Sequence, residues 1–179
     1  MSHSESQAPA RLTPAQLLAR LDALGIRTTT VEHPPVFTVE EAKQLRGELP
    51  GGHCKSLFLR DKKERMWLVV ALEDRRIDLK TLQTRLGATR ISFGSPERLM
   101  SVLGVIPGSV TPFALANDRE RRVLPVLDAA MMRVSPLNYH PLSNDMTTAI
   151  APEDLLAFIR DCGHEPVLMD FDAPEAAGA

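Results

Sequence analysis

The sequence has few of the residue patterns that indicate disulfides, metals or membrane spans. Its two cysteines, Cys54 and Cys162, are far apart and form no CxxC pair, which argues against a disulfide framework and a zinc site. The five histidines show no HExxH or similar ligand spacing. No run of 18 apolar residues is present, so a membrane span is excluded. We therefore expect a protein without metal or cofactor that does not bind membranes.

The length and composition are those of one globular domain. The chain has 179 residues, of which 44% are hydrophobic and 25% are charged. The N-terminus lacks an apolar core of the signal-peptide type, so the cytoplasm is the expected compartment. We expect a disordered N-terminus (1–11), one domain (12–171) and a disordered tail (172–179).

Charge is unevenly distributed along the chain, although the net charge is only −2. Residues 1–122 carry 19 basic and 14 acidic side chains, a net charge of +5. Residues 123–179 carry 2 basic and 9 acidic side chains, a net charge of −7. Two interpretations stay open: chance segregation over a solvated surface, or one basic face that meets a phosphate backbone.

Local signals predict several helices. Thr13-Pro14-Ala15-Gln16 is a capping box with proline at the first helical position, and Gly25 ends the apolar stripe that follows. A second capping box, Thr38 to Glu41, predicts a short helix that ends near Gly47. Further helices are predicted to begin near residues 78, 95 and 152.

The predicted strands mix hairpins with single strands. Residues 28–32 are β-rich, and two prolines stop them. The apolar runs 56–60 and 66–72 predict one hairpin, and the runs 113–116 and 123–127 predict a second hairpin that turns near residues 117–118. Single strands are expected at 146–150 and 167–169. Because strands and helices do not alternate regularly, we predict an α+β (mixed α/β) domain with a mixed, largely antiparallel sheet wrapped by helices.

Two segments carry candidate catalytic groups. Lys55 follows a glycine-rich stretch at the entrance of a predicted strand, where a side chain can reach an adjacent cleft, although most such lysines are simply solvated. Around Gly108 and Ser109, successive backbone N–H groups could point at an oxyanion. The alternative is an ordinary turn. Ser109 has no GxSxG elbow that would mark it as a nucleophile.

Two more segments carry candidate binding groups. His33-Pro34-Pro35-Val36-Phe37 is rigid and would suit the wall of a pocket, or it is only a strand terminator beside a helix cap. In the segment 138–145, His140 could orient a substrate or a water, and Asn144 could bind a polar group. Both could equally be structural, His140 as a satisfied histidine and Asn144 as a turn former.

These segments together resemble one family. In chain order they are VEHPPVFTVEEA, GGHCKSLFLRD, GVIPGSVTPFALAND, VLDAAMM and NYHPLSNDMTTAI. In this order the sequence is similar, from about Thr13 to Met169, to the YbaK/aminoacyl-tRNA synthetase-associated domain family. Within that family it resembles the free-standing prolyl-tRNA editing proteins (ProXp-ala). The family's GxxxP loop matches 108–112, and its HPxxN segment matches 140–144.

The resemblance implies hydrolysis of the ester between a wrong amino acid and the 3′ end of tRNA, here Ala-tRNA(Pro). It implies that Lys55 holds and polarises the aminoacyl group or the terminal nucleotide, and that Gly108 and Ser109 N–H groups stabilise the oxyanion. Water is the expected nucleophile, assisted by a hydroxyl of the terminal ribose. The expected substrate-binding residues are Pro35, Val36, Phe37, Thr111, Pro112, His140 and Asn144.

The implied partner is the acceptor end of mischarged proline tRNA, with no role for DNA. Prolyl-tRNA synthetase or an elongation factor is a candidate for delivering it. Two alternatives stay open: a sister deacylase for another amino acid, such as cysteine or serine, and a non-catalytic module that binds tRNA or a synthetase.

Overall fold

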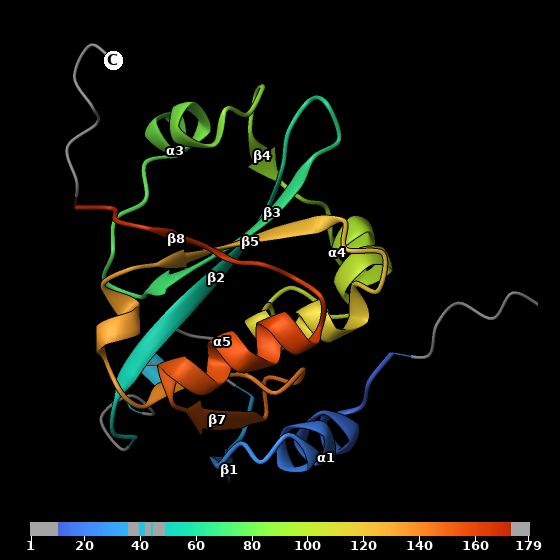
Figure 1. Ribbon diagram of the computed structural model, residues 1–179, viewed down its shortest axis with the longest axis vertical. Helices are drawn as coiled ribbons and strands as arrows, with labels where there is room; N and C mark the ends of the chain where they lie inside the picture. The colour runs from blue at the N-terminus through green and yellow to red at the C-terminus, as the bar shows by residue number, and fades with distance from the viewer. Residues whose placement is uncertain (1–10, 36–39, 42–43, 45–48, 173–179) are drawn as a thin grey trace, which may run out of the picture.

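Eight strands form one mixed sheet, and helices cover both of its faces (Figure 1). The computed structural model describes residues 11–35, 40–41, 44 and 49–172. The strand order is β1-β7-β6-β2-β3-β5-β8, and β4 pairs with β2. The strands are β1 (Thr28–Glu32), β2 (Gly52–Arg60), β3 (Met66–Leu72), β4 (Ser92–Phe93), β5 (Val123–Asp128), β6 (Leu137–Tyr139), β7 (Met146–Ile150) and β8 (Val167–Met169).

The predicted fold class is confirmed. Four strand pairings are antiparallel, and the other three, β2 with β6, β3 with β5 and β5 with β8, are parallel. The predicted hairpin of β2 and β3 forms, with Lys55 opposite Ala71. In the described residues, no helix is long and apolar enough to cross a bilayer.

The second predicted hairpin is wrong. Residues Pro112–Asn117 form a 3₁₀ helix, η1, which Thr111 caps, and not a strand. β5 pairs in parallel with β3, with Val123 opposite Met66, and has no hairpin partner of its own. A short apolar run fits a buried helical turn as well as a strand, and its periodicity cannot separate the two.

The other predicted helices are present. They are α1 (Pro14–Ala23), α3 (Leu79–Leu86), α4 (Pro96–Leu103) and α5 (Pro152–Asp161), and a short 3₁₀ turn, η2 (Met131–Arg133), follows β5. In the capping box of α1, Gln16 N–H donates to Thr13 Oγ1 and Thr13 N–H donates to Gln16 Oε1. The helix predicted from Thr38 to Gly47 lies outside the described residues, apart from 40–41 and 44.

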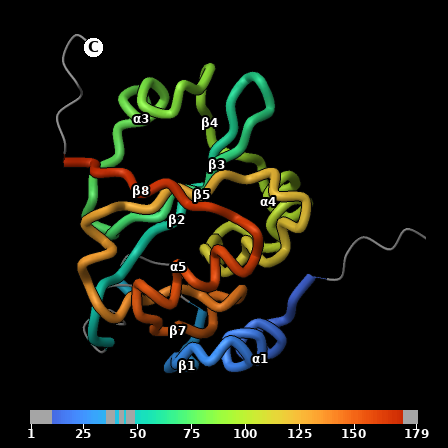
Figure 2. Tube along the Cα trace, in the orientation of Figure 1, coloured from blue at the N-terminus to red at the C-terminus, as the bar shows by residue number. Residues whose placement is uncertain are grey.

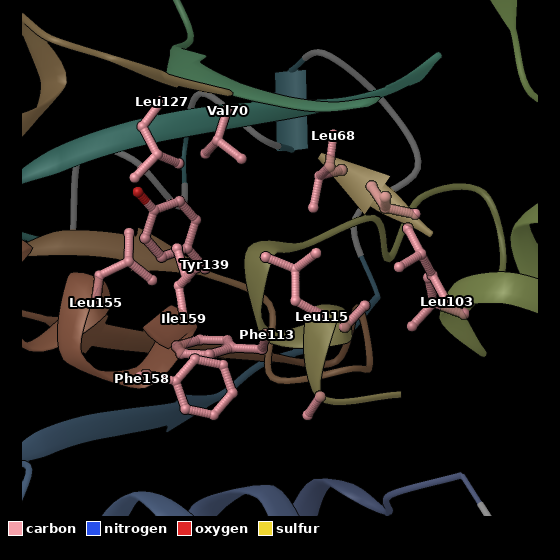
Figure 3. Close-up of a cluster of buried hydrophobic side chains, with 14 of the residues drawn as sticks. Leu68, Val70, Leu103, Phe113, Leu115, Leu127, Tyr139, Leu155, Phe158 and Ile159 are labelled. Atoms are coloured by element: carbon pink, nitrogen blue, oxygen red, sulfur yellow. The ribbon is translucent and has the colours of Figure 1, made fainter. Parts of the chain in front are cut away.

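Alternation along the strands builds two apolar cores. Phe58 joins the larger core with α1, α4, η1 and α5, and its neighbour Leu59 joins the smaller core beneath α3. In the larger core, Phe113 meets Phe158 and Tyr139 edge to face, with ring centroids 5.5 and 5.9 Å apart (Figure 3). Such pairs contribute about 0.5–1.5 kcal/mol each beyond burial. This packing fixes β6 against η1 and α5.

Candidate functional site

Lys55 lies in the first half of β2, where the strand faces the loop after β3. Its side chain is half-buried, and its Nζ donates a hydrogen bond to the carbonyl oxygen of Arg75. The Arg75 guanidinium in turn pairs with Asp172, and its Nε lies 3.6 Å from the carboxylate of buried Asp128. The carbonyl that holds Lys55 therefore belongs to a loop that two carboxylates anchor.

The parallel pairing of β2 and β6 brings the predicted histidine segment beside the strand of Lys55. His53 is opposite Asn138 in the ladder, while Tyr139 points into the larger core. Lys55 and His140 each lie two residues beyond the His53–Asn138 pair. Strand alternation therefore directs Lys55 toward the face away from the larger core, and His140 follows directly after the end of β6.

His140 is held in one tautomer. Its Nδ1 lies 2.8 Å from the carbonyl oxygen of Met146, and because a carbonyl only accepts, Nδ1 carries the proton. Burial lowers the pKa of His140, and the nearby His33 lowers it further. The ring is therefore neutral at pH 7. Its Nε2 presents a lone pair that no hydrogen bond among the described residues uses.

His33 lies beside His140, and the sequence did not single it out as a binding residue. Its ring centroid lies 6.2 Å from that of His140, and its Nε2 lies 2.8 Å from Thr147 Oγ1. The rigid segment that begins with His33-Pro34-Pro35 was the only sequence feature that pointed to this histidine. Pro35 is exposed two residues further on. The other two predicted wall residues, Val36 and Phe37, lie outside the described residues.

The Gly108 turn faces the HPxxN segment. Gly108 has φ +92°, and proline precedes it, which is the pattern of a type II turn. A Cβ at Gly108 would lie 4.0 Å from Asn144 Nδ2. The structure thus brings together two predicted segments that are more than thirty residues apart in the sequence.

Three residues around this turn that were predicted to contact the substrate are buried in the structure. Ser109 is 2% exposed, and its N–H donates to Ile106 O across the turn at 3.0 Å, so it is not available to an oxyanion in this conformation. Thr111 is fully buried, and its hydroxyl accepts the N–H of Phe113. Pro112 is also buried. Thr111 and Pro112 therefore shape the loop without offering a surface to a substrate. Of the two predicted oxyanion donors, Gly108 N–H is the one without an acceptor within the described part of the chain.

A hollow of ≈ 440 Å³ opens next to the loop that holds Lys55. It lies between the start of β2 and the loop after β3, and its lining includes Gly52, His53, Arg75 and Arg76. Within the described ranges, no group of three or more His, Cys, Asp or Glu side chains is arranged to hold a metal ion.

Comparisons with known proteins agree with this architecture. The aminoacyl-tRNA editing domain family matches residues 33–158. Prolyl-tRNA synthetase associated domain-containing protein 1 of Bos taurus is 42% identical over 163 residues, covering 88% of this chain and 95% of its own. Prolyl-tRNA editing protein ProX of Acetoanaerobium sticklandii is 40% identical over 149 residues, covering 83% and 91%.

A solved structure of a candidate trans-editing enzyme for prolyl tRNA synthetase has the same fold. It superposes with a TM-score of 0.67 at 21% identity, over 90% of this chain and 99% of that one. The family match spans the β2 lysine, the Gly108 turn and the HPxxN segment. The chain belongs to the aminoacyl-tRNA editing domain family.

Proposed function

We propose that this protein is a trans-editing deacylase that hydrolyses the ester of mischarged Ala-tRNA(Pro) in the cytoplasm. The observation that carries the proposal is the approach of the Gly108 turn to Asn144 of the HPxxN segment, which also holds His140 with its proton on Nδ1. The names of the relatives from Bos taurus and Acetoanaerobium sticklandii support proline tRNA as the substrate.

The reaction needs placement and charge stabilisation more than a strong nucleophile, because an aminoacyl ester is already activated. Water attacks the ester carbonyl carbon, and the carbonyl electrons move onto oxygen. The Gly108 N–H donates to this oxyanion. The bond to the ribose oxygen then breaks, and the proton lost by the attacking water reaches that oxygen through the neighbouring ribose hydroxyl. The products are free alanine and tRNA with an intact 3′ end.

His140 orients this proton path. Because its Nδ1–H is committed to Met146 O, its Nε2 can only accept, and a ribose hydroxyl or the attacking water is the matching donor. Asn144, beside Gly108, offers an amide that can bind the substrate's amino group or carbonyl oxygen. Lys55 holds the aminoacyl group or the terminal nucleotide by its charge.

Specificity follows from size. Alanine is smaller than proline, and a missing methylene is worth only about 1–3 kcal/mol in one pocket, so an activating enzyme cannot exclude alanine by packing alone. A second pocket that admits alanine and rejects proline solves this. We assign its wall to Pro35, Val36 and Phe37. Prolyl-tRNA synthetase or an elongation factor would hand over the substrate.

The test is a deacylation panel run with a matched pair of lysine variants. Wild-type protein is incubated separately with proline tRNA charged with alanine, cysteine, serine or proline. The release of the amino acid from each tRNA is followed over time. We expect cleavage of the alanine ester and survival of the proline ester. Lys55→Ala should lose nearly all activity while remaining folded. Lys80→Ala, which removes an exposed lysine on α3, should keep it.

The outcomes separate the alternatives. Preferred cleavage of the cysteine or serine ester would make the protein a sister deacylase. Binding of proline tRNA without cleavage of any ester would make it a non-catalytic module. Equal activity of Lys55→Ala and wild type would remove Lys55 from the site.

A further inference from the structure

Three turns meet at the end of the sheet opposite to Lys55. They connect β2 to β3 (residues 61–65), follow α3 (87–90) and precede β5 (119–122). Lys62 N–H donates to Thr89 O at 2.7 Å, which joins the first two turns, and both lie at the same end of the trace in Figure 2. The ladder pairs Met66 with Val123, so the first and third turns are also neighbours. We call these three turns the basic end.

A buried aspartate builds the first two turns of the basic end. Asp61 has no exposed surface, and its carboxylate accepts hydrogen bonds from the backbone of Lys63, Arg65 and Thr89 and from the Arg65 guanidinium. Burial opposes ionisation, but these hydrogen bonds lower the pKa of Asp61 to about 2. The carboxylate therefore stays charged and holds the two turns in one arrangement.

A second buried aspartate builds the third turn in the same way. Asp118 is 3% exposed and accepts the N–H groups of Arg122 and Val123 at 3.0 and 2.8 Å. His164 Nε2 lies 2.9 Å from the same carboxylate. Arg121, within this turn, has a left-handed backbone with φ 55°. Non-glycine residues rarely adopt this conformation unless the surroundings impose it.

The rigid turns present an excess of free positive charge. Glu64, an acid in the first turn, is already within 2.6 Å of Arg98 and 3.6 Å of Arg60. Glu120 is a further exposed acid in these turns. Six exposed cations of the basic end make no ion pair within the described residues: Lys62, Lys63, Arg90, Arg119, Arg121 and Arg122.

We propose that the basic end binds the phosphate backbone of the tRNA acceptor arm, several nucleotides away from the ester; this inference rests on the proposed function. Lys55 and Arg60 are five residues apart on β2, which corresponds to about 17 Å at about 3.3 Å per residue. One strand of a duplex carries one phosphate for about every 3.4 Å along the helix axis, so a distance of about 17 Å corresponds to about five nucleotides. A strand whose 3′ end lies at Lys55 therefore reaches the basic end with its helical phosphates.

Cationic side chains without acidic partners are suited to binding phosphates. Each phosphate that they neutralise releases counterions from the nucleic acid, and no ion pair within the protein has to break first. An acidic protein surface would find the same charge. However, tRNA offers charge at a regular spacing that continues from the ester itself. Unchanged tRNA affinity of a variant that alters the basic end would therefore favour an acidic protein as the partner and count against the proposal.

The test compares two double charge reversals that change the net charge equally. Lys62→Glu with Arg119→Glu alters the basic end, and Arg27→Glu with Lys80→Glu alters exposed cations outside it. Binding of uncharged proline tRNA is measured by fluorescence anisotropy over a range of salt concentrations. We expect the basic-end variant to bind about tenfold more weakly at low salt, with a slope of log K against log salt reduced by about 1–2. The control should keep most of the affinity and slope.

A short substrate separates this surface from the catalytic site. Alanine esterified to a trinucleotide CCA end should be cleaved equally by wild type and the basic-end variant, because it does not reach the basic end. Unchanged tRNA affinity, an equal loss in the control, or loss of short-substrate cleavage in a folded variant would overturn the inference. If tRNA binding behaves as expected but no ester is cleaved by wild type, the proposed function fails and the binding surface stands.

Discussion

Replacing Gly108 with alanine tests the oxyanion donor most directly. The residue has φ +92°, and a left-handed conformation costs an L-residue about 1–2 kcal/mol. The nearest heavy atom to a new Cβ is Asn144 Nδ2 at 4.0 Å, so no clash adds to this cost. In a chain of 179 residues, this corresponds to a drop in melting temperature of about 2–8 °C.

The variant can relieve the strain by rotating the peptide between Pro107 and residue 108, which converts the turn from type II to type I. That rotation carries the N–H of residue 108 away from the oxyanion. Loss of one such donor typically lowers kcat by about 10²–10³. Gly108→Ala is therefore expected to be folded, slightly less stable and strongly impaired in single-turnover deacylation of Ala-tRNA(Pro).

Gly87→Ala is the matched control. Gly87 has φ +64° at the C-terminus of α3, and no atom lies within 4 Å of a Cβ placed there. Its stability should fall by a similar amount while its deacylation rate stays unchanged. If Gly108→Ala loses stability like Gly87→Ala but cleaves within threefold of wild type, Gly108 N–H does not bind the oxyanion.

Three further predictions follow from the structure. Because burial and a neighbouring histidine lower the pKa of His140, kcat/KM should fall only below the ordinary histidine value of about 6.5, and a pH profile of His140→Gln should lack this acid limb. Burial raises the pKa of Asp118, but hydrogen bonds from His164 and two backbone N–H groups outweigh it and lower that pKa. The stability that the Asp118 carboxylate contributes to the fold is therefore lost as the pH falls through the lowered pKa. In thermal and denaturant unfolding, Asp118→Asn should lose about 1.5–3 kcal/mol at neutral pH and show a flatter acid dependence. Arg75→Ala frees the loop whose carbonyl holds the site lysine and should lower kcat about tenfold or more, with partial rescue by Arg75→Lys; a change in melting temperature alone would contradict this role.

Helices could be predicted from the sequence because their signals are local. The capping box at Thr13 and Gln16 and the glycine after α4, Gly104 with φ 67°, each act within one turn of the residues they terminate. The β2–β3 hairpin is local for the same reason. These elements needed no knowledge of what packs against them.

Strand partners that are far apart in the sequence could not be predicted in this way. The run 113–116 is apolar because it is buried in the larger core as a 3₁₀ helix, and only its neighbours reveal that. β5 is buried between β3 and β8, and its pattern does not say which strands flank it or in which direction. The three-residue strand β6 overlaps the segment 138–145, for which the sequence predicted no strand.

The candidate site, too, could be predicted only in part. The order of its segments predicted which parts of the chain take part, and the structure places Gly108 beside Asn144. Hydrogen-bond partners depend on the folded backbone, however. The sequence therefore could not reveal that Ser109 N–H closes a turn or that Thr111 is buried.

One buried amide sets the relation between the two halves of the site. Asn138 Nδ2 donates to the carbonyl oxygens of Pro50 and Gly52 at 3.0 and 3.1 Å, which locks β6 to the start of β2. Side chains alternate along a strand, and seven residue pairs hold β2 to β3, so a slip of one residue between β2 and β6 would exchange the faces of Tyr139 and His140. The histidine would then enter the apolar core and the tyrosine would leave it. With only two registered residue pairs between β2 and β6, the backbone ladder alone leaves that register weakly defined, and the Asn138 amide supplies the specificity that the short ladder lacks.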